Sequence, residues 1–220
     1  MYGLIGDNGS GKSTLLKLLA GHSHATFGEI TLLGASGEKE LERARRHIGC
    51  LIEYPGFFPN MTVEQTLKYY CMQKGVPDAK KFEEAMRVTG ILEKRKSKCR
   101  TLSLGQAQKL GLAIALLGEP RLLILDEPIN GLDPSSILEF RSMIRRLNTE
   151  KNMTIVLSSH ILSELEQIAD VYGFLYKGQL LEEISAPALA EKCMDCMEIT
   201  VSDMETFAAA IDQCIPAEQY

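Results

Sequence analysis

A phosphate-binding loop stands at the start of the chain. Residues 6–13 read GDNGSGKS, which matches the pattern G-x-x-x-x-G-K-[ST]. Glycines let successive backbone N–H groups turn toward one anion, and a helix beginning near Lys12 directs its positive dipole end to the same point. A glycine-rich turn before a helix is the alternative, which the flanking apolar strand and amphipathic helix disfavour. We predict that these residues bind nucleotide phosphates: Gly6, Asp7, Asn8, Gly9, Ser10, Gly11, Lys12, Ser13 and Thr14.

Two carboxylates end an apolar run later in the chain. Residues 122–125 are all leucine or isoleucine, and Asp126 and Glu127 follow directly. A buried strand delivers such residues to its carboxyl end, where open α/β sheets bind ligands. We predict that Ser13 and Asp126 hold Mg²⁺ and that Glu127 orients and deprotonates the attacking water. Without the phosphate loop, a solvated acidic turn would be an equal alternative.

A histidine follows another apolar strand. His160 comes soon after residues 154–158, so it is expected at the same edge of the sheet as Glu127. A neutral imidazole there could donate a hydrogen bond to the γ-phosphate and hold the attacking water in line. The alternative is an ordinary surface histidine. We predict a catalytic role for His160 because of its position after a sheet strand.

The elements that must position these residues alternate between strands and helices. Such alternation is typical of an α/β fold with a mostly parallel sheet and helices on its faces. Lys177-Gly178 predicts a tight turn, with residues 179–183 pairing back as a hairpin. The strands are expected at residues 2–5, 29–33, 47–52, 122–125, 154–158 and 171–176.

The stretch from about 56 to 118 breaks this alternation, because it reads as helices only. Thr62 and Gln65 have capping-box spacing, and Pro77-Asp78 is expected to start another helix. An all-helical block between two strands of one sheet predicts an inserted lobe. A basic run at residues 94–100 is interpreted as a solvated turn, with an electrostatic contact to a partner or nucleotide as the alternative.

Composition excludes several classes of protein. The 220 residues carry a net charge of −5, which argues against nucleic acid as the main partner. No apolar run is long enough to span a membrane, and no export signal is recognisable, so the six cysteines are interpreted as reduced cytosolic thiols. Cys193 and Cys196 are interpreted as ordinary helix thiols, although half of a metal site or a redox pair has the same spacing.

A short motif links these features to a known family. Leu102-Ser103-Leu104-Gly105-Gln106 resembles the signature of ABC-type ATPases, and the other elements follow in that family's order, including an "Asp loop" at residues 131–134. The resemblance implies a P-loop NTPase (RecA-like) core with an inserted helical signature lobe, and ATP and Mg²⁺ as cofactors. It covers roughly residues 1–184, which we assign to one ATP-binding domain, and leaves residues 185–220 as an extension of unknown role.

The resemblance also implies partners. Ser103 and Gln106 have capping-box spacing, so a helix with free N–H groups is expected to begin there. In the family this signature reaches the γ-phosphate held by a second ATP-binding domain, which assigns Ser103, Gly105 and Gln106 to the partner's nucleotide and predicts a homodimer. The chain would hydrolyse ATP at the cytoplasmic face of the membrane to power a separate permease, docked on residues 54–62.

Two residues depart from the family pattern. Leu104 replaces a signature glycine, so its side chain must fit near the phosphate or point aside. Glu53 stands where most relatives have Gln, a residue that contacts Mg²⁺ or the water, and it adds a negative charge there. Glu53 together with this signature resembles the subgroup that protects bacteria against bacitracin and lantibiotic peptides. Glu53 is therefore included among the predicted catalytic and metal-binding residues.

The chain lacks the strands and the adenine-stacking aromatic residue that usually precede the phosphate loop in this family. We therefore expect weaker ATP binding than in a longer version, and a first strand, residues 2–5, without a sheet neighbour. Two other functions stay open at this point. A non-transport ABC clamp acting on DNA would have coiled coils or basic faces, and a module that only binds ATP would not need Glu127 and His160.

Overall fold

The computed structural model describes residues 1–53, 56–76 and 79–194. The chain divides into two compact units, Met1–Ala186 and Pro187–Tyr220. The first contains all the strands found in the described residues and every element that carries a predicted site residue. Of the second, the structure describes only part of one helix, α8 (Ala186–Met194). The predicted boundary between an ATP-binding domain and an extension at residue 184 remains a prediction.

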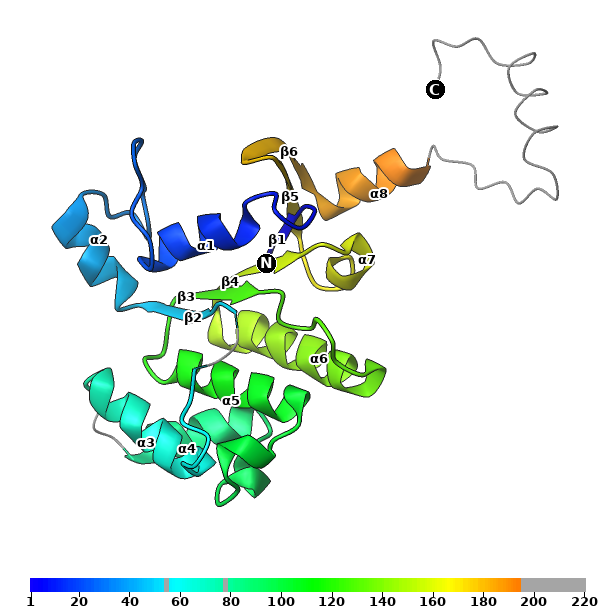
Figure 1. Ribbon diagram of the computed structural model, residues 1–220. Helices are drawn as coiled ribbons and strands as arrows, with labels where there is room; N and C mark the ends of the chain where they lie inside the picture. The colour runs from blue at the N-terminus through cyan, green and yellow to red at the C-terminus, as the bar shows by residue number, and fades with distance from the viewer. Residues whose placement is uncertain (54–55, 77–78, 195–220) are drawn as a thin grey trace, which may run out of the picture. The chain divides into compact units, whose positions relative to one another are not determined.

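One six-stranded sheet, in the order β2-β3-β4-β1-β5-β6, organises the first unit (Figure 1). Neighbouring strands are parallel except for β5 and β6, which form the expected antiparallel hairpin. The predicted α/β architecture is therefore confirmed. The strands are β1 (Tyr2–Ile5), β2 (Ile48–Leu51), β3 (Leu122–Asp126), β4 (Thr154–Ser159), β5 (Val171–Tyr176) and β6 (Gln179–Ser185).

The first strand lies in the interior of the sheet. Tyr2 of β1 is in register with Val156 of β4 on one side and with Val171 of β5 on the other. The expectation that this strand lacks a neighbour is therefore wrong. Its partners are supplied by strands that come more than a hundred residues later, and a preceding segment is not needed to pair it.

The strand predicted at residues 29–33 does not form in the described structure. Leu32 makes only an isolated bridge with Ala35, and Leu33 and Gly34 between them adopt positive φ angles of 52° and 81°. This geometry is a tight turn. Leu32 itself is buried, so the apolar residues that looked like a strand serve to anchor a loop.

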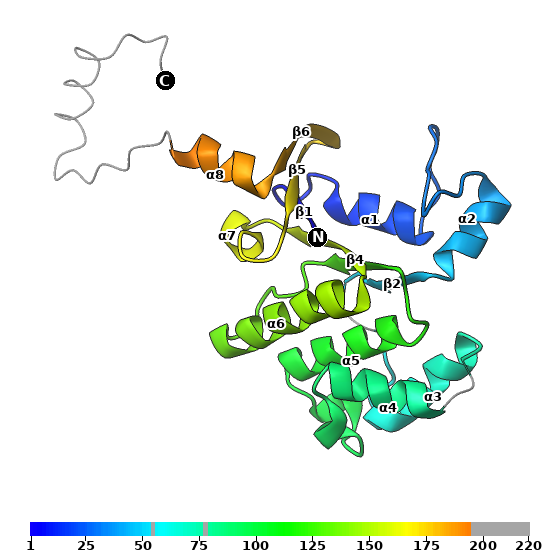
Figure 2. The same cartoon turned by 180° about the vertical axis from the view of Figure 1, so that it is seen from behind.

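Helices cover both faces of the sheet. On one face, Leu16 of α1 (Lys12–Ala20) and Ala44 of α2 (Glu38–Arg45) pack with Leu4 and Ile124 from the strands. On the other lie α5 (Leu104–Leu116) and α6 (Pro134–Lys151), which run side by side when the molecule is seen from either direction (Figure 2). A single helical turn, α7 (Leu162–Leu165), follows β4.

The block between β2 and β3 forms a helical lobe, as predicted. It contains α3 (Val63–Gln73), α4 (Ala79–Val88), two short 3₁₀ turns (Leu92–Lys94 and Cys99–Thr101) and α5. The lobe has its own core, including Leu67, Met86 and Leu110. Pro77 and Asp78 lie outside the described residues, and α4 begins directly after them. No helix in the described ranges is long and apolar enough to cross a membrane.

The cysteines are not paired where the structure describes them. Cys50, Cys71, Cys99 and Cys193 are free thiols. Cys196, the second half of the C-x-x-C pattern, lies outside the described residues. The interpretation of this pattern therefore remains a prediction.

Candidate functional site

The phosphate loop connects β1 to α1 and presents an uncapped helix start. Gly11 occupies the N-cap position at φ 107°, no side chain caps the helix, and its first turn contains no acidic residue. Gly9 also has a positive φ, 81°, a conformation that other residues rarely adopt. The free N–H groups and the positive end of the helix dipole therefore face the loop and can receive an anion.

The β5–β6 hairpin supports the loop from behind. The Gly178 N–H donates to the Ser10 carbonyl oxygen at 2.8 Å. A Cβ atom added to Gly6 would lie 2.3 Å from the carbonyl oxygen of Leu175, so only glycine fits there. The tight turn was predicted from Lys177-Gly178, but its contact with the phosphate loop was not, because nothing local relates residues so far apart in the sequence.

The Lys12 ammonium is buried in the loop, where its side chain is 5% exposed. Its Nζ donates to the carbonyl oxygens of Gly6 at 2.6 Å and Asp7 at 3.1 Å, and lies 3.6 Å from Glu127 Oε1. The buried Ser10 hydroxyl has no hydrogen-bond partner among the described residues. An ammonium, an unpaired hydroxyl and free N–H groups around one loop fit a triphosphate.

Asp126 ends β3 as a buried carboxylate, 9% exposed. Its Oδ1 accepts a hydrogen bond from Ser158 Oγ at 2.5 Å, and the same Oγ accepts the Glu127 N–H at 2.9 Å. Ser158 lies opposite Asp126 in the β3–β4 register. Sequence reasoning missed this serine, although a polar residue near the end of an otherwise apolar strand was a usable signal.

The residues present fit Mg²⁺, which needs few protein ligands, better than a metal ion that takes most of its ligands from side chains. Ser13 lies in the first turn of α1 behind the phosphate loop, and Asp126 ends the strand beside β4. No group of three or more His, Cys, Asp or Glu side chains suited to a metal occurs in the described part of the chain. Magnesium commonly takes one or two protein ligands and completes its shell with water and phosphate oxygens.

Glu127 and His160 are in direct contact. His160 Nδ1 lies 2.9 Å from Glu127 Oε2, and Asn130 Nδ2 donates to the same oxygen at 3.0 Å. An ionised carboxylate only accepts, so Nδ1 must carry the proton. A neutral His160 in this contact then has no second N–H, and it needs another proton, or must leave Glu127, to donate to a phosphate. The predicted hydrogen bond from a neutral His160 to the γ-phosphate therefore cannot form while His160 donates to Glu127.

Glu53 lies apart from the two acidic residues at the end of β3. Its carboxylate accepts a hydrogen bond from Lys17 Nζ of α1 at 2.5 Å, and this bond holds the pKa of Glu53 below its usual value. No described hydrogen bond or ion pair joins Glu53 to Asp126 or Glu127. Glu53 has a positive φ of 60° and stands directly before residues 54–55, which lie outside the described structure.

The signature starts a helix, as its capping-box spacing predicted. Ser103 Oγ accepts the Gln106 N–H at 3.3 Å, and Gln106 Oε1 accepts the Ser103 N–H at 3.1 Å. Leu104 points aside, since its Cδ2 lies 3.3 Å from the position of a Cβ built on Gly131 in the Asp loop. Within the described chain no hydrogen bond connects the signature to the phosphate loop.

The Asp loop is fixed by the start of α6. Asp133 is the N-cap and accepts hydrogen bonds from Ser135 Oγ, Ser136 Oγ and the Ser136 N–H. These hydrogen bonds hold the pKa of the Asp133 carboxyl well below its usual range. A Cβ on Gly105 would lie 3.2 Å from Ser136 Oγ, so the signature and the Asp loop are packed closely within one chain.

Comparison with known proteins identifies the family. The family model described as ABC transporter matches residues 1–130. The bacitracin transport ATP-binding protein BcrA of Enterococcus faecalis is 39% identical over 212 residues, which cover 96% of this chain and 69% of that protein. The lantibiotic transport ATP-binding protein SrtF of Streptococcus pyogenes is 42% identical over 184 residues, 83% of this chain and 78% of that protein.

Solved structures agree with this assignment. A structure described as the ATP binding subunit of an ABC transporter has a TM-score of 0.74 and 27% identity, and the match covers 96% of this chain and 88% of that one. The dimeric structure of MJ0796, a bacterial ABC transporter cassette, has the same fold with a TM-score of 0.76 at 23% identity, over 84% of this chain and 85% of that one. The chain therefore belongs to the ABC transporter family, as its ATP-binding and ATP-hydrolysing subunit.

Proposed function

We propose that this chain hydrolyses ATP to drive a separate permease that exports antimicrobial peptides of the bacitracin or lantibiotic type. The observation that carries the proposal is the meeting of Lys12, Glu127 and His160 at the carboxyl ends of the central strands. The names of two similar transport proteins, BcrA and SrtF, supply the substrate class. The relatives favour this function over a DNA-binding clamp.

Each residue has a chemical task in this proposal. The loop from Gly6 to Thr14 binds the phosphates through its N–H groups, and the Lys12 ammonium exchanges its carbonyl partners for phosphate oxygens. Ser13 and Asp126 would hold Mg²⁺, which supplies positive charge to the outer phosphates. Glu127 accepts the proton of the attacking water, and His160 holds Glu127 before it turns to the terminal phosphate.

Glu53 is the third acidic residue that we assign to the site. Its ion pair with Lys17 holds it beside α1 in the structure described here. We propose that Glu53 reaches the metal or the water when the lobe and the core close on a nucleotide. The Lys17 pair is exposed, and such pairs are weak, so exchanging it for a metal contact requires little free energy.

The site is completed by a second chain in this proposal. The phosphate loop and the signature make no described hydrogen bond within one chain. The start of α1 is uncapped, and the capping box of α5 leaves the first N–H groups of that helix, at Leu104 and Gly105, for an anion. Ser103, Gly105 and Gln106 of one copy would therefore bind the γ-phosphate held by its partner. Two copies related by a two-fold axis form two such sites.

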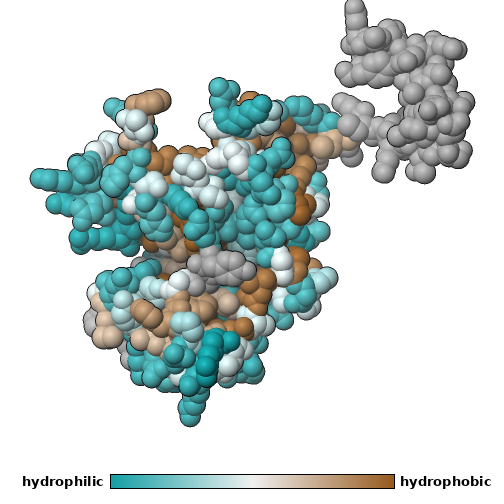
Figure 3. All heavy atoms as spheres, viewed as in Figure 1, coloured by the Kyte–Doolittle hydropathy of each residue, from teal (hydrophilic) through white to brown (hydrophobic). Residues whose placement is uncertain are grey.

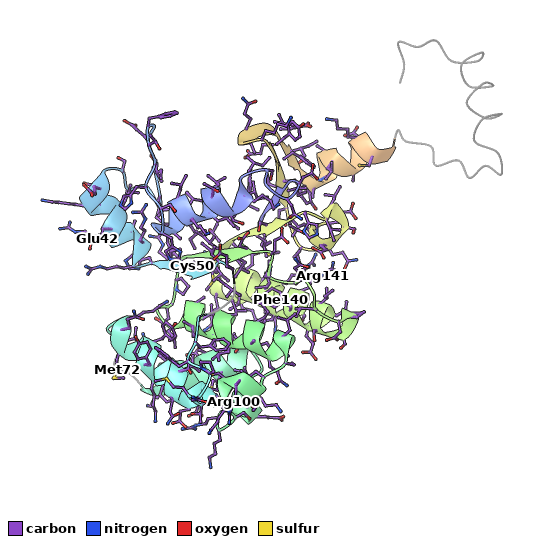
Figure 4. All side chains as sticks on the ribbon, viewed as in Figure 1. Glu42, Cys50, Met72, Arg100, Phe140 and Arg141 are labelled. Atoms are coloured by element: carbon purple, nitrogen blue, oxygen red, sulfur yellow. The ribbon has the colours of Figure 1, made fainter. Side chains whose placement is uncertain are left out.

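The helical lobe is proposed as the permease contact, at the cytoplasmic face of the membrane. Apolar surface is visible over this lobe in Figure 3. Phe58 and Met72 are 51% and 74% exposed, and Phe58 packs edge to face on Tyr69. Met72 projects from the outer edge of the lobe (Figure 4). Tyr54 and Pro55, which belong to the same predicted surface, lie outside the described residues.

Replacing the catalytic base tests the proposal directly. Glu127→Gln keeps the shape of the side chain but cannot take a proton, so turnover of the purified chain should fall at least ~100-fold while ATP still binds. Glu42→Gln is the matched control, because Glu42 is an exposed residue of α2 (Figure 4). Phosphate release by Glu127→Gln near the rate of the unmodified chain would remove Glu127 from the mechanism.

The substrate class is tested in cells. A strain that lacks this chain should become more sensitive to bacitracin or to a lantibiotic, and the unmodified gene should restore resistance. The Glu127→Gln gene should not restore it, because transport needs hydrolysis. Unchanged sensitivity to both peptide classes would refute the proposed substrate but leave the ATPase activity in place.

A further inference from the structure

We propose that Asn130 is a positioning residue that holds the Glu127 carboxylate so that one of its oxygens stays free for the attacking water. The inference rests on the proposed role of Glu127 as the base. Asn130 follows the acidic strand by a few residues and touches neither the phosphate loop nor the signature in any described hydrogen bond. It therefore acts through Glu127 rather than on the nucleotide.

The backbone brings the two residues together. The Asn130 N–H donates to the Glu127 carbonyl oxygen at 3.2 Å, which closes a tight turn. Glu127 adopts a positive φ of 45°, an unfavourable conformation for a residue with a side chain, and its N–H is held by Ser158 Oγ at 2.9 Å. Both the N–H and the carbonyl oxygen of Glu127 are therefore held by hydrogen bonds, which fixes the backbone that carries the carboxylate.

The two carboxylate oxygens of Glu127 have different environments. Oε2 receives two side-chain donors, Asn130 Nδ2 at 3.0 Å and His160 Nδ1 at 2.9 Å. The one contact that the described residues make with Oε1 is the Lys12 ammonium, at 3.6 Å. When Lys12 binds phosphate instead, Oε1 becomes the oxygen that is free to accept a proton. The terminal torsion of glutamate is broad, so a hydrogen-bond donor on one oxygen helps to fix this orientation.

Asn130 is the donor that can keep its hydrogen bond to Glu127 Oε2 throughout the reaction. The Nδ1–H of His160 lies on Oε2, so it must leave Glu127 before it can donate to a phosphate. The Asn130 amide does not titrate and has no competing described partner. It therefore keeps Oε2 occupied and Oε1 directed at the water while His160 changes partners.

Variants of Asn130 separate positioning from binding. Asn130→Ala should lower kcat about 10-fold, because a misplaced base is inefficient, while KM and the affinity for a fluorescent ATP analogue stay unchanged. Asn130→Asp has the same shape but accepts instead of donating, and it should be at least as slow. Asn130→Ser keeps a donor and should recover part of the rate. Glu42→Ala, at an exposed position of α2 away from every proposed contact, is the control.

A double variant shows whether Asn130 acts through Glu127. Glu127→Gln has no base to position, so adding Asn130→Ala should leave its residual turnover unchanged. An equal loss in both backgrounds, an unchanged kcat in Asn130→Ala alone, or a weakened ATP affinity would each overturn the proposal. If the unmodified chain hydrolysed no ATP, the proposed function would fail by itself.

A measurement that does not depend on ATP hydrolysis tests the contact even if the chain proves inactive. The side-chain amide resonance of Asn130 in ¹⁵N-labelled protein should shift in Glu127→Gln and stay in place in Glu42→Gln. A shift would establish the contact whether or not the chain turns over, and an unmoved resonance would refute the proposed positioning.

Discussion

At the scale of single residues, the buried Lys12 ammonium is the group most affected by an arriving nucleotide. Its present partners are two loop carbonyl oxygens and the nearby Glu127 carboxylate. Charge-assisted hydrogen bonds to phosphate contribute ~1.5–3 kcal/mol each, so Lys12→Ala should weaken ATP binding at least ~10-fold. Titration with a fluorescent ATP analogue measures this, with Lys39→Ala on exposed α2 as the control. Equal affinity in both variants would contradict the role of Lys12.

Residue identities predicted the main reactive groups but not the groups that orient them. Lys12, Asp126 and Glu127 are recognisable because their types and spacing are demanding. Ser158 and Asn130 are common residue types, and their importance depends on strand register and on a local turn. The metal contact of Glu53 was implied by the family resemblance and stays a prediction, and the pairing of Glu53 with Lys17 could not be read from the sequence.

At the scale of elements, two capping boxes of the same design occur in one lobe. Thr62 caps α3 and Ser103 caps α5, each with a glutamine three residues later. Replacing either cap by alanine should cost about 1 kcal/mol of stability. Only Ser103→Ala should also reduce ATP hydrolysis, because only α5 is proposed to face a phosphate. Denaturant unfolding and phosphate release measure the two effects, and equal activity in both variants would contradict the proposed use of the signature.

An ion-pair cluster ties α3 to the turn before the signature. Arg95 donates two hydrogen bonds of 2.9 Å to Glu64, and Lys68 pairs with it at 2.7 Å. The hydrogen bonds from Arg95 and then Lys68 lower the pKa of Glu64 to about 2. Because the unfolded value is near ~4.3, this contribution to stability is complete above that pH and is lost as pH falls toward 2.

Glu64→Gln should therefore destabilise the lobe at neutral pH and have little effect near pH 2. Urea unfolding at several pH values measures the difference between the two proteins. Glu42→Gln, which removes only an exposed helix pair, should show a much smaller dependence on pH. A difference that stayed constant with pH would show that the charge of Glu64 does not stabilise the lobe.

Element types were easier to predict than element partners. The apolar runs at 122–125 and 154–158 form strands, as expected for short buried runs that are bounded by turns. The run at 29–33 has similar composition but no neighbour to bond with, so it forms a turn anchored by Leu32. The first strand was predicted to lack a neighbour, but β4 and β5 pair with it from distant parts of the sequence. In both cases the local sequence does not show which strands will become neighbours.

At the scale of the whole molecule, the strand order explains how the proposed site residues of one chain come together. The carboxyl ends of β1, β3 and β4 meet at one edge, so the phosphate loop, Glu127 and His160 come together there. The signature lies on the helical lobe and packs against its own Asp loop through Leu104 and Gly131. The proposed arrangement, in which the signature of one copy meets the phosphate loop of another, makes use of both of these parts.

Mixing two inactive variants tests this composite site. Lys12→Ala loses its own phosphate contact but keeps a working signature, whereas Ser103→Glu keeps its phosphate loop and repels the partner's phosphate. Random pairing makes half of the dimers mixed, each with one complete site, so the mixture should recover about a quarter of the unmodified activity if the sites act independently. Dilution should lower this activity, because the sites exist only in dimers. A mixture no more active than the two variants measured separately would contradict a site shared between two chains.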